Sequence, residues 1–348
     1  MHLCRSAAAL AVLAASTWVH AGTVTVLTSF PKELTTAYQK AFDAKNPGIK
    51  VEILNKNTVA GIAYVREYFG HVAISSPSRS GTMTVETILQ GEGWDKGWTQ
   101  LLEMMGNAAA VTDRSFAVPD GVNNGQYGVG IVIDFFGLAG KYSGFPVDFV
   151  YPSMTSVVPA NIALIAGGKN PDEAKKFMAF SMSTEGQQLL FDPKISRLPI
   201  LPYSQLKAPA GYPDPQEVAK RAKVQFDANL SEARYQVVTS LFDQMVTFRL
   251  KELQGATKAI QDAEKALKAK PNARGSDLVK QARALAYTPL VGAQNVKNEQ
   301  FLELFRKSRR DVEVSKQLSG QEQLWANKAR ENYARAQQLA TEARGLAK

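Results

Sequence analysis

Cysteine is almost absent from this chain: Cys4 is the only one. It lies in the N-terminal stretch that we expect to be removed on export, which leaves the mature chain without disulfides or thiol chemistry. Histidine is scarce as well, with three in the sequence and only His71 beyond that stretch. No Ser-His-Asp order, metal-ligand spacing or Walker-type glycine loop is present. The sequence therefore predicts a protein that is not an enzyme and needs no cofactor.

Long apolar runs are lacking too, and none after residue 21 could form a membrane helix. The N-terminus has the pattern of a secretory signal, with Arg5 followed by a short Ala-rich apolar segment at residues 6–19. The run Val19-His20-Ala21 fits a small-residue cleavage site. We therefore expect a signal peptide at residues 1–21 and export, most simply to a bacterial periplasm.

Positive charge is unevenly distributed. Residues 215–348 hold 24 Lys and Arg against 15 Asp and Glu, whereas residues 1–214 hold 17 of each. The whole net charge of +9 therefore belongs to the C-terminal part. An exported protein without an aromatic-rich basic stripe is a poor candidate for nucleic acid binding. A solvated helical face, meeting an acidic partner or a membrane surface, is the favoured interpretation.

A loop rich in small residues, 75–82, separates a strand-like run at 71–74 from a helix-like run at 83–90. Unpaired N–H groups and the helix dipole make such a helix start attractive to anions. Serine and threonine hydroxyls and a guanidinium add further donors. The alternative is an ordinary polar turn with Ser80 or Thr82 as helix cap. The candidate ligand-binding residues of the loop are Ser76, Ser78, Arg79, Ser80, Gly81 and Thr82.

The N-terminal part reads as a βαβ unit, with strands at 23–27 and 49–53 around a helix at 32–43. Such a unit implies a parallel sheet, whose ligands lie beyond the carboxyl ends of the strands. Thr28 and Ser29 stand at that end, where they either line a site or cap the following helix. Asp134 ends a later buried-looking strand and either accepts ligand hydroxyls, caps the next helix or pairs with a base.

Further along the chain, residues 147–152 and 157–166 read as strands, and residues 172–181 and 185–190 as helices. The tryptophans Trp94 and Trp98 are spaced for the core side of a helix. From residue 216 a long helix is predicted to 270, broken at 271–275 and resumed at 276–286. Residues 299–348 carry few large apolar side chains and are predicted to form a solvated terminal helix.

Taken in order, these segments resemble bacterial extracellular solute-binding proteins of ABC transporters. The resemblance is strongest to the ferric-iron-type branch, which also contains phosphoglycerate- and hexose-phosphate-binding members. The matching segments are TVTVLTSFPKELTTAYQKAFDAKNPGIKVEILNKNTVAGIAYVRE (23–67), YFGHVAISSPSRSGT (68–82), TVETILQGEGWDKGW (84–98), YGVGIVIDFFGLA (127–139), VDFVYP (147–152) and VVPANIALIAGGKNPDEAKKFMAF (157–180).

The resemblance implies an α/β fold with two lobes that close on a ligand in the cleft, after which the closed form docks on a membrane permease. Thr28 and Ser29 would line the cleft from one lobe. Loop residues 76–82, Asp134 and Tyr151 would line it from the other. The iron binders of the family use adjacent tyrosines, and this sequence has no Tyr-Tyr pair. A small anionic solute, phosphorylated or carboxylate, is therefore favoured over ferric iron.

One departure from the family is large: Glu67 runs directly into Tyr68, where relatives carry several more strands. The expected division is a truncated first lobe from 22–67 and 157–214, a second lobe from 68–156, and a basic helical extension from 215–348. We expect a monomeric periplasmic binding component of an importer. The alternatives are a ferric-iron binding protein and a regulatory protein that signals to a membrane sensor.

Overall fold

The structure is a computed structural model that describes residues 23–28, 40, 44, 50–55, 70–77, 81–152, 154–307 and 310–347, with the first two strands described by their backbone alone. The strands are β1 (Thr23–Thr28), β2 (Lys50–Asn55), β3 (Val72–Ser75), β4 (Ala108–Thr112) and β5 (Val129–Ile131). The helices are α3 (Thr82–Glu92), α4 (Trp94–Gly106), α5 (Ala117–Asn123), α6 (Asp134–Tyr142), α7 (Pro171–Met182), α8 (Thr184–Gln188), α9 (Pro215–Arg221), α10 (Ala228–Met245), α11 (Leu250–Ala269), α12 (Ala273–Tyr287), α13 (Glu299–Arg306) and α14 (Val312–Gly345). Short 3-10 helices cover Leu189–Phe191, Tyr203–Gln205, Thr247–Arg249 and Asn295–Lys297.

The strands form two separate parallel sheets. β1 and β2 pair over their full length, from Thr23 opposite Lys50 to Thr28 opposite Asn55, which confirms the parallel pairing predicted for these two segments. The second sheet has the order β4-β3-β5, and β3 runs parallel to both neighbours. Parallel neighbours bring the carboxyl ends of all three strands to one edge. The fold class at this level is α/β with small parallel sheets.

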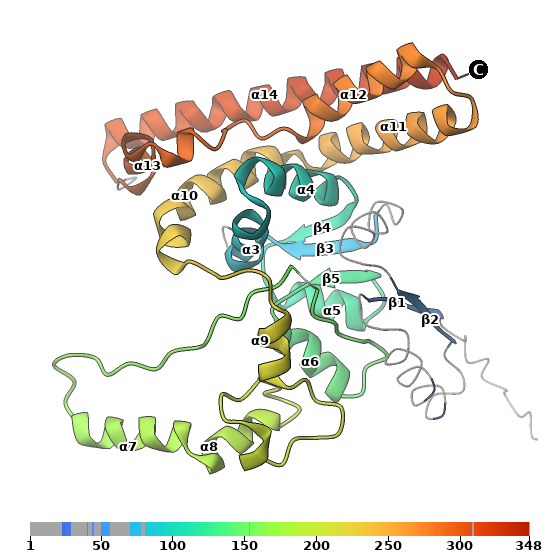
Figure 1. The fold of residues 1–348 in the computed structure, drawn as a ribbon. Coiled ribbons are helices and arrows are strands. Elements are labelled where there is room, and N and C mark those ends of the chain that lie inside the picture. The colour runs from blue at the N-terminus through green and yellow to red at the C-terminus, as the bar shows by residue number, and fades with distance from the viewer. Residues whose placement is uncertain are drawn as a thin grey trace, which may run out of the picture.

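Figure 1 shows the helices stacked in layers above and below the three-stranded sheet. α3 and α4 lie against its upper side, α10 and α11 cover them, and α5 and α6 lie below. The predicted core position of the two tryptophans is confirmed, because Trp98 is fully buried and Trp94 nearly so. The Trp94 indole Nε1 donates to the Val291 carbonyl at 2.7 Å, which ties α4 to the C-terminal helices. One hydrophobic core therefore runs from β3 into the C-terminal part.

Three of the C-terminal helices, α10, α12 and α14, begin at side-chain caps. Asp227 accepts from the Leu230 N–H at the start of α10, at 3.0 Å. Asn272, after the predicted Pro271 break, accepts from the Gly275 N–H at 2.9 Å and starts α12. Asp311 accepts from two N–H groups at the start of α14. Such caps satisfy donors that the first helical turn leaves without intrahelical partners.

The terminal helix is not solvated as predicted. α14 packs along α11 and α12 as a three-helix bundle (Figure 1), and its contact face is made mostly of alanine. Core positions recur at alternating intervals of three and four, as in a coiled coil. Alanine lets helix axes approach closely, so few large apolar residues are needed, and the sequence pattern was misread for that reason. The buried residues with this spacing are Ala326, Ala329, Tyr333, Ala336, Ala340 and Ala343.

Three other segments also differ from their predictions. The long helix predicted for 216–270 is divided into α9, α10 and α11. Residues 147–152 and 157–166 form no strand, although both have strand-like sequences. A strand needs a neighbour for its backbone hydrogen bonds, and in the described part of the chain neither segment has one. None of the described helices is sufficiently long and apolar to cross a membrane.

Candidate functional site

The candidate site lies where β3 ends and α3 begins. The Ser76 N–H donates to the Thr112 carbonyl of β4 at 2.9 Å, which extends the sheet one residue past β3. The chain then turns back, and the Gly81 N–H donates to the Ser76 carbonyl at 2.9 Å. This hydrogen bond joins two residues that are five positions apart, and α3 begins at the next residue, Thr82. The start of α3 consequently stands at the carboxyl edge of the β4-β3-β5 sheet, where open α/β sheets hold ligands.

Glycine is required at position 81. A Cβ on Gly81 would lie 2.0 Å from the Ser75 carbonyl oxygen and 2.9 Å from its carbon, and both atoms are backbone. Glycine also leaves α3 without a capping side chain, and the first turn of the helix contains no acidic residue. The Thr82 hydroxyl donates to the Pro77 carbonyl at 2.7 Å and so holds the loop instead. The helix start thus presents N–H groups and partial positive charge without a negative side chain in its first turn.

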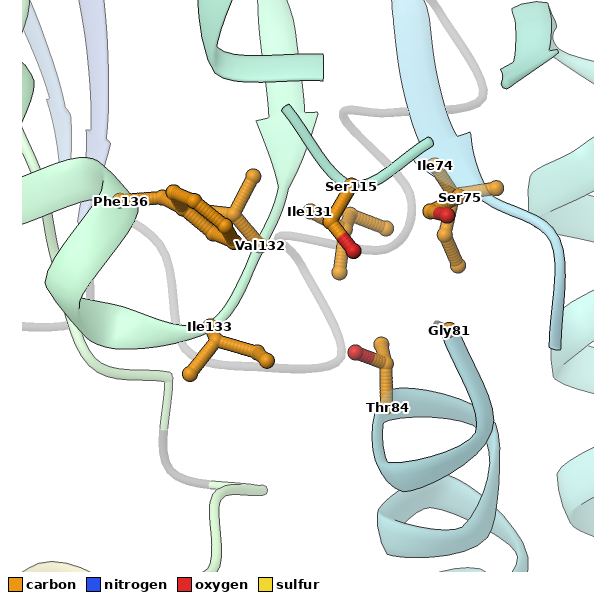
Figure 2. Close-up of a pocket in the computed structure, with 9 residues that line it drawn as sticks. All are labelled: Ile74, Ser75, Gly81, Thr84, Ser115, Ile131, Val132, Ile133 and Phe136. Carbon is orange, nitrogen blue, oxygen red and sulfur yellow. The ribbon is translucent and has the colours of Figure 1, made fainter. Parts of the chain in front are cut away.

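A small cavity opens at this point, as Figure 2 shows. Its volume of about 10 Å³ is close to the space that one water molecule needs. Hydroxyl groups of Ser75, Thr84 and Ser115 face it from three different elements, and apolar side chains close the opposite wall. The apolar lining residues are Ile74, Ile131, Val132, Ile133 and Phe136. The cavity can therefore hold one water molecule, and its hydroxyl groups together with the helix N-terminus suit an oxygen atom of an anion bound at its mouth.

Three predicted site residues are brought together here. Gly81 lines the cavity, Thr82 follows it, and Ser76 lies beneath the loop with only 1% of its surface exposed. The Ser76 hydroxyl donates to the Asp243 carboxylate of α10 at 3.4 Å, so it faces the helical layer. Ser29, Ser78, Arg79 and Ser80 lie outside the described residues, as does the side chain of Thr28. Their predicted roles stay predictions.

Asp134 and Tyr151 are paired with each other. Asp134 is the first residue of α6, and its carboxylate accepts from the Phe135 N–H at 2.8 Å. Its second oxygen accepts from the Tyr151 hydroxyl at 3.0 Å. Neither residue lines the cavity, although Ile133 and Phe136 beside them do. Asp134 therefore holds Tyr151 and the first turn of α6 in place, although it is not the N-cap of that helix, and its role toward a ligand stays a prediction.

Burial raises the pKa of several tyrosines around this pair. The pKa of Tyr151 lies above its ordinary value, first because of burial and second because ionisation would place a phenolate beside Asp134. Burial also raises the pKa of Tyr212 to about 12, against a weaker lowering by a hydrogen bond from Ser196. Both hydroxyls stay protonated well above neutral pH, so Tyr151 acts as a hydrogen-bond donor.

This tyrosine cluster predicts a loss of stability in base. An unfolded tyrosine ionises near pH 10, whereas Tyr212 holds its proton until about pH 12. The unfolded chain therefore binds fewer protons between these limits, and the free energy of unfolding should fall as pH rises above about 10. Urea midpoints measured from about pH 9 to about pH 11 test this. Tyr212→Phe should make the decline shallower, and an unchanged slope would contradict the assignment.

Other functional residues were not found from the sequence. Thr84 lies in the helix after the loop, and Ser115 lies in the turn after β4, a strand that the sequence analysis did not predict. Asp243 sits within a helix far along the chain and reaches Ser76 only through tertiary packing. A polar residue that follows a parallel strand is a signal for a site residue in an α/β sheet. This signal would have indicated Ser115 if β4 had been predicted as a strand.

The same helix, α10, also holds α3 through a buried ion pair. The Arg234 guanidinium donates to both Glu86 carboxylate oxygens, with its Nε at 2.9 and 3.1 Å and its Nη2 at 2.7 Å. Both side chains are buried. The guanidinium also lies over the Trp94 ring, 5.2 Å from the ring centre. α10 therefore contacts the site at two points, the loop through Asp243 and the helix through Arg234.

The chain is similar to known binding proteins over part of its length. Residues 65–219 match a family model described as bacterial extracellular solute-binding protein. The phosphoglycerate transport regulatory proteins PgtC of Salmonella typhimurium and of Salmonella typhi are each 34% identical to it over 204 residues. That alignment covers 58% of this chain and 50% of each relative, so the chain spans about half the length of the curated relatives it matches. The matched family is one of binding proteins and not of enzymes, which confirms the non-enzymatic interpretation.

Proposed function

We propose that this protein binds a small anionic solute at the junction of β3 and α3 and serves an ABC importer in the periplasm. The observation that carries the proposal is the start of α3, which has no capping side chain and opens into a cavity faced by three hydroxyl groups. A phosphate or carboxylate group would accept hydrogen bonds from both. The match of residues 65–219 to a solute-binding family supports the same function.

In this proposal the second lobe is the part built on the β4-β3-β5 sheet, and the first lobe is the part that contains β1 and β2. The solute would enter between them and leave through a membrane permease. Arg79 would add a fixed positive charge from the loop, as the sequence predicts. Phosphoglycerate is the first solute to test, because the name of the PgtC relatives refers to it. The ferric-iron alternative is less favoured, because the described site offers hydroxyl and N–H donors in place of metal ligands.

Isothermal titration of the full mature chain tests the proposal. The ligands are 2- and 3-phosphoglycerate, hexose 6-phosphate, inorganic phosphate and sulfate. We expect one organic phosphate to bind with a Kd below about 1 mM. Thr84→Val or Ser115→Ala should weaken that binding about tenfold, as expected for loss of one hydrogen bond to a charged group. Thr99→Val is the matched control, because the Thr99 hydroxyl bonds the Asp95 carbonyl on the exposed side of α4.

No binding of any ligand by a folded protein would contradict the proposal. Equal weakening by the Thr99 variant would show that the cavity hydroxyls have no special role. A circular dichroism spectrum of each variant separates loss of binding from loss of fold.

A regulatory role is the second candidate, and one observation favours it. α10 lies beyond the family match and contacts both the loop and α3. A ligand that moves the loop would therefore act directly on the C-terminal helices. A strain that lacks this protein but expresses the permease constitutively distinguishes the candidates. Loss of uptake in this strain indicates the transport component, whereas retained uptake, together with loss of induction when the permease is under its own promoter, indicates the regulator.

A further inference from the structure

A long segment after residue 156 is exposed along its length and belongs to no helix or strand. Every residue from 157 to 173 is exposed, and Ile165 has 81% of its surface exposed. The segment leaves the sheet and runs outward as an extended trace to α7 (Figure 1). In the described part of the chain its one backbone hydrogen bond joins the Gly168 N–H to the Ile165 carbonyl. We refer to residues 157–168 as the strap.

The strap has the composition of a buried strand. Residues 160–165 directly follow Pro159. In an extended chain they would place apolar side chains on both faces. Such a pattern is typical of strands that are covered on both sides. Pro159 has no N–H and is therefore suited to the position just before a strand. The strap thus has the sequence of a six-residue strand without a sheet.

The helix that follows the strap is equally uncovered. α7 contains no buried residue, and Phe177 has 63% of its surface exposed. Phe180 and Met182 are exposed on the same helix. A strand followed by a helix normally packs the helix on the face of the sheet that the strand joins. Strap and α7 together therefore have the pattern of a β-α unit without its sheet, and their exposed apolar side chains make them a candidate interaction site.

The complementary part is present in the same chain. β1 and β2 are six residues long, and among the described strands they pair only with each other. An isolated two-stranded sheet is marginally stable at best in water. In Figure 1 this sheet and α7 project on opposite sides of the molecule. Within one copy the strap would have to cross the body of the molecule to reach this sheet, and the strap of a second copy would not.

We propose that the strap and α7 of one copy dock on the β1–β2 sheet of a second copy. The strap would add a third strand by edge pairing, and α7 would cover the face of the enlarged sheet. Reciprocal exchange gives a closed dimer with two equal interfaces. The sheet of the second copy offers the strap a strand edge for its backbone hydrogen bonds. It also offers α7 a sheet face on which to pack its apolar side chains. The proposal replaces the monomer expected from the sequence and is independent of the solute.

Light scattering coupled to size-exclusion chromatography tests the dimer on the full mature chain. We expect twice the monomer mass, and a monomer for Ala163→Pro, which removes one strand N–H from the strap. Because residue 163 is exposed and outside any helix or strand, the substitution should leave the fold of the monomer unchanged. Leu324→Asp is the control, since Leu324 is 65% exposed on α14, away from the strap. A monomer at all concentrations, or a dimer unaffected by Ala163→Pro, would overturn the proposal.

Cross-linking identifies the surfaces that meet. Chains labelled with 14N and with 15N are mixed, refolded together and treated with a lysine-reactive linker. Lys169 at the end of the strap should link to Lys50 at the start of β2 in mixed-isotope pairs. Links within one isotope alone would mean that the strap folds back on its own sheet. Binding of the monomer to phospholipid vesicles, with no mixed links, would assign the surface to a membrane and reject the dimer.

Discussion

Replacing Glu86 by alanine is expected to cost about 3–5 kcal/mol of the free energy of unfolding. The substitution leaves the Arg234 guanidinium buried between α3 and α10 without its carboxylate partner. An unpaired buried charge loses its Coulombic partner and does not regain water. Urea unfolding followed by circular dichroism measures the change. In the part of the chain that the structure describes, the cation–π contact with Trp94 is what remains to offset the loss.

Two further variants distinguish the buried pair from a general effect of removing charge. Glu331→Ala removes an acid that pairs with Lys328 on the surface of α14 and should change the urea midpoint little. Glu86→Leu combined with Arg234→Met removes both charges and should recover most of the lost stability. A double variant as unstable as Glu86→Ala would show that packing, and not the unpaired charge, dominates.

Replacing Gly81 by alanine should weaken solute binding by at least about tenfold, or about 1.4 kcal/mol. The new Cβ would lie 2.0 Å from the Ser75 carbonyl oxygen, so either the loop or the start of α3 must move. The contact is with backbone atoms, so a side-chain rotation cannot relieve it. Calorimetric titration with the solute identified for the wild-type chain measures the loss.

Gly320→Ala is the control for this substitution. Gly320 lies on the exposed side of α14, and a Cβ there meets no atom within 4 Å. Its replacement should raise the free energy of unfolding by about 0.5–1 kcal/mol, because alanine is the better helix former. A Gly81 variant that binds as tightly as the wild type would show that the tight turn is not part of the binding site.

The sequence predicted the parts of the fold that depend on local pattern. The strand, small-residue loop and helix around residues 75–82 were predicted because a run of small polar residues separates two apolar segments there. The tryptophan pair of α4 was placed in the core from its spacing alone. The sequence of α14 predicts a solvated helix because large apolar side chains are few, whereas alanine forms most of its contact face. The strap was predicted as a strand because its composition is that of one, but a strand forms only where a partner edge exists.

The candidate site, too, was predicted only where it depends on local sequence pattern. Gly81 and Thr82 belong to a contiguous motif and could be found by reading along the chain. Ser115 and Asp243 reach the site through sheet pairing and helix packing, which leave no local signal. Asp134 was assigned to a strand end, and the structure places it at the first turn of α6, where it bonds its own helix.

The shared core has a consequence for the order in which the molecule assembles. Chains are synthesised from the N-terminus, and domains generally fold as units. α3 and α4 leave the ribosome early, but the helices that cover their apolar side, α10 and α11, begin only at Ala228 and Leu250. Trp98 therefore stays exposed until most of the chain has been made. A chain that ends before α10 would therefore leave the apolar side of α3 and α4 uncovered, and such a surface favours aggregation.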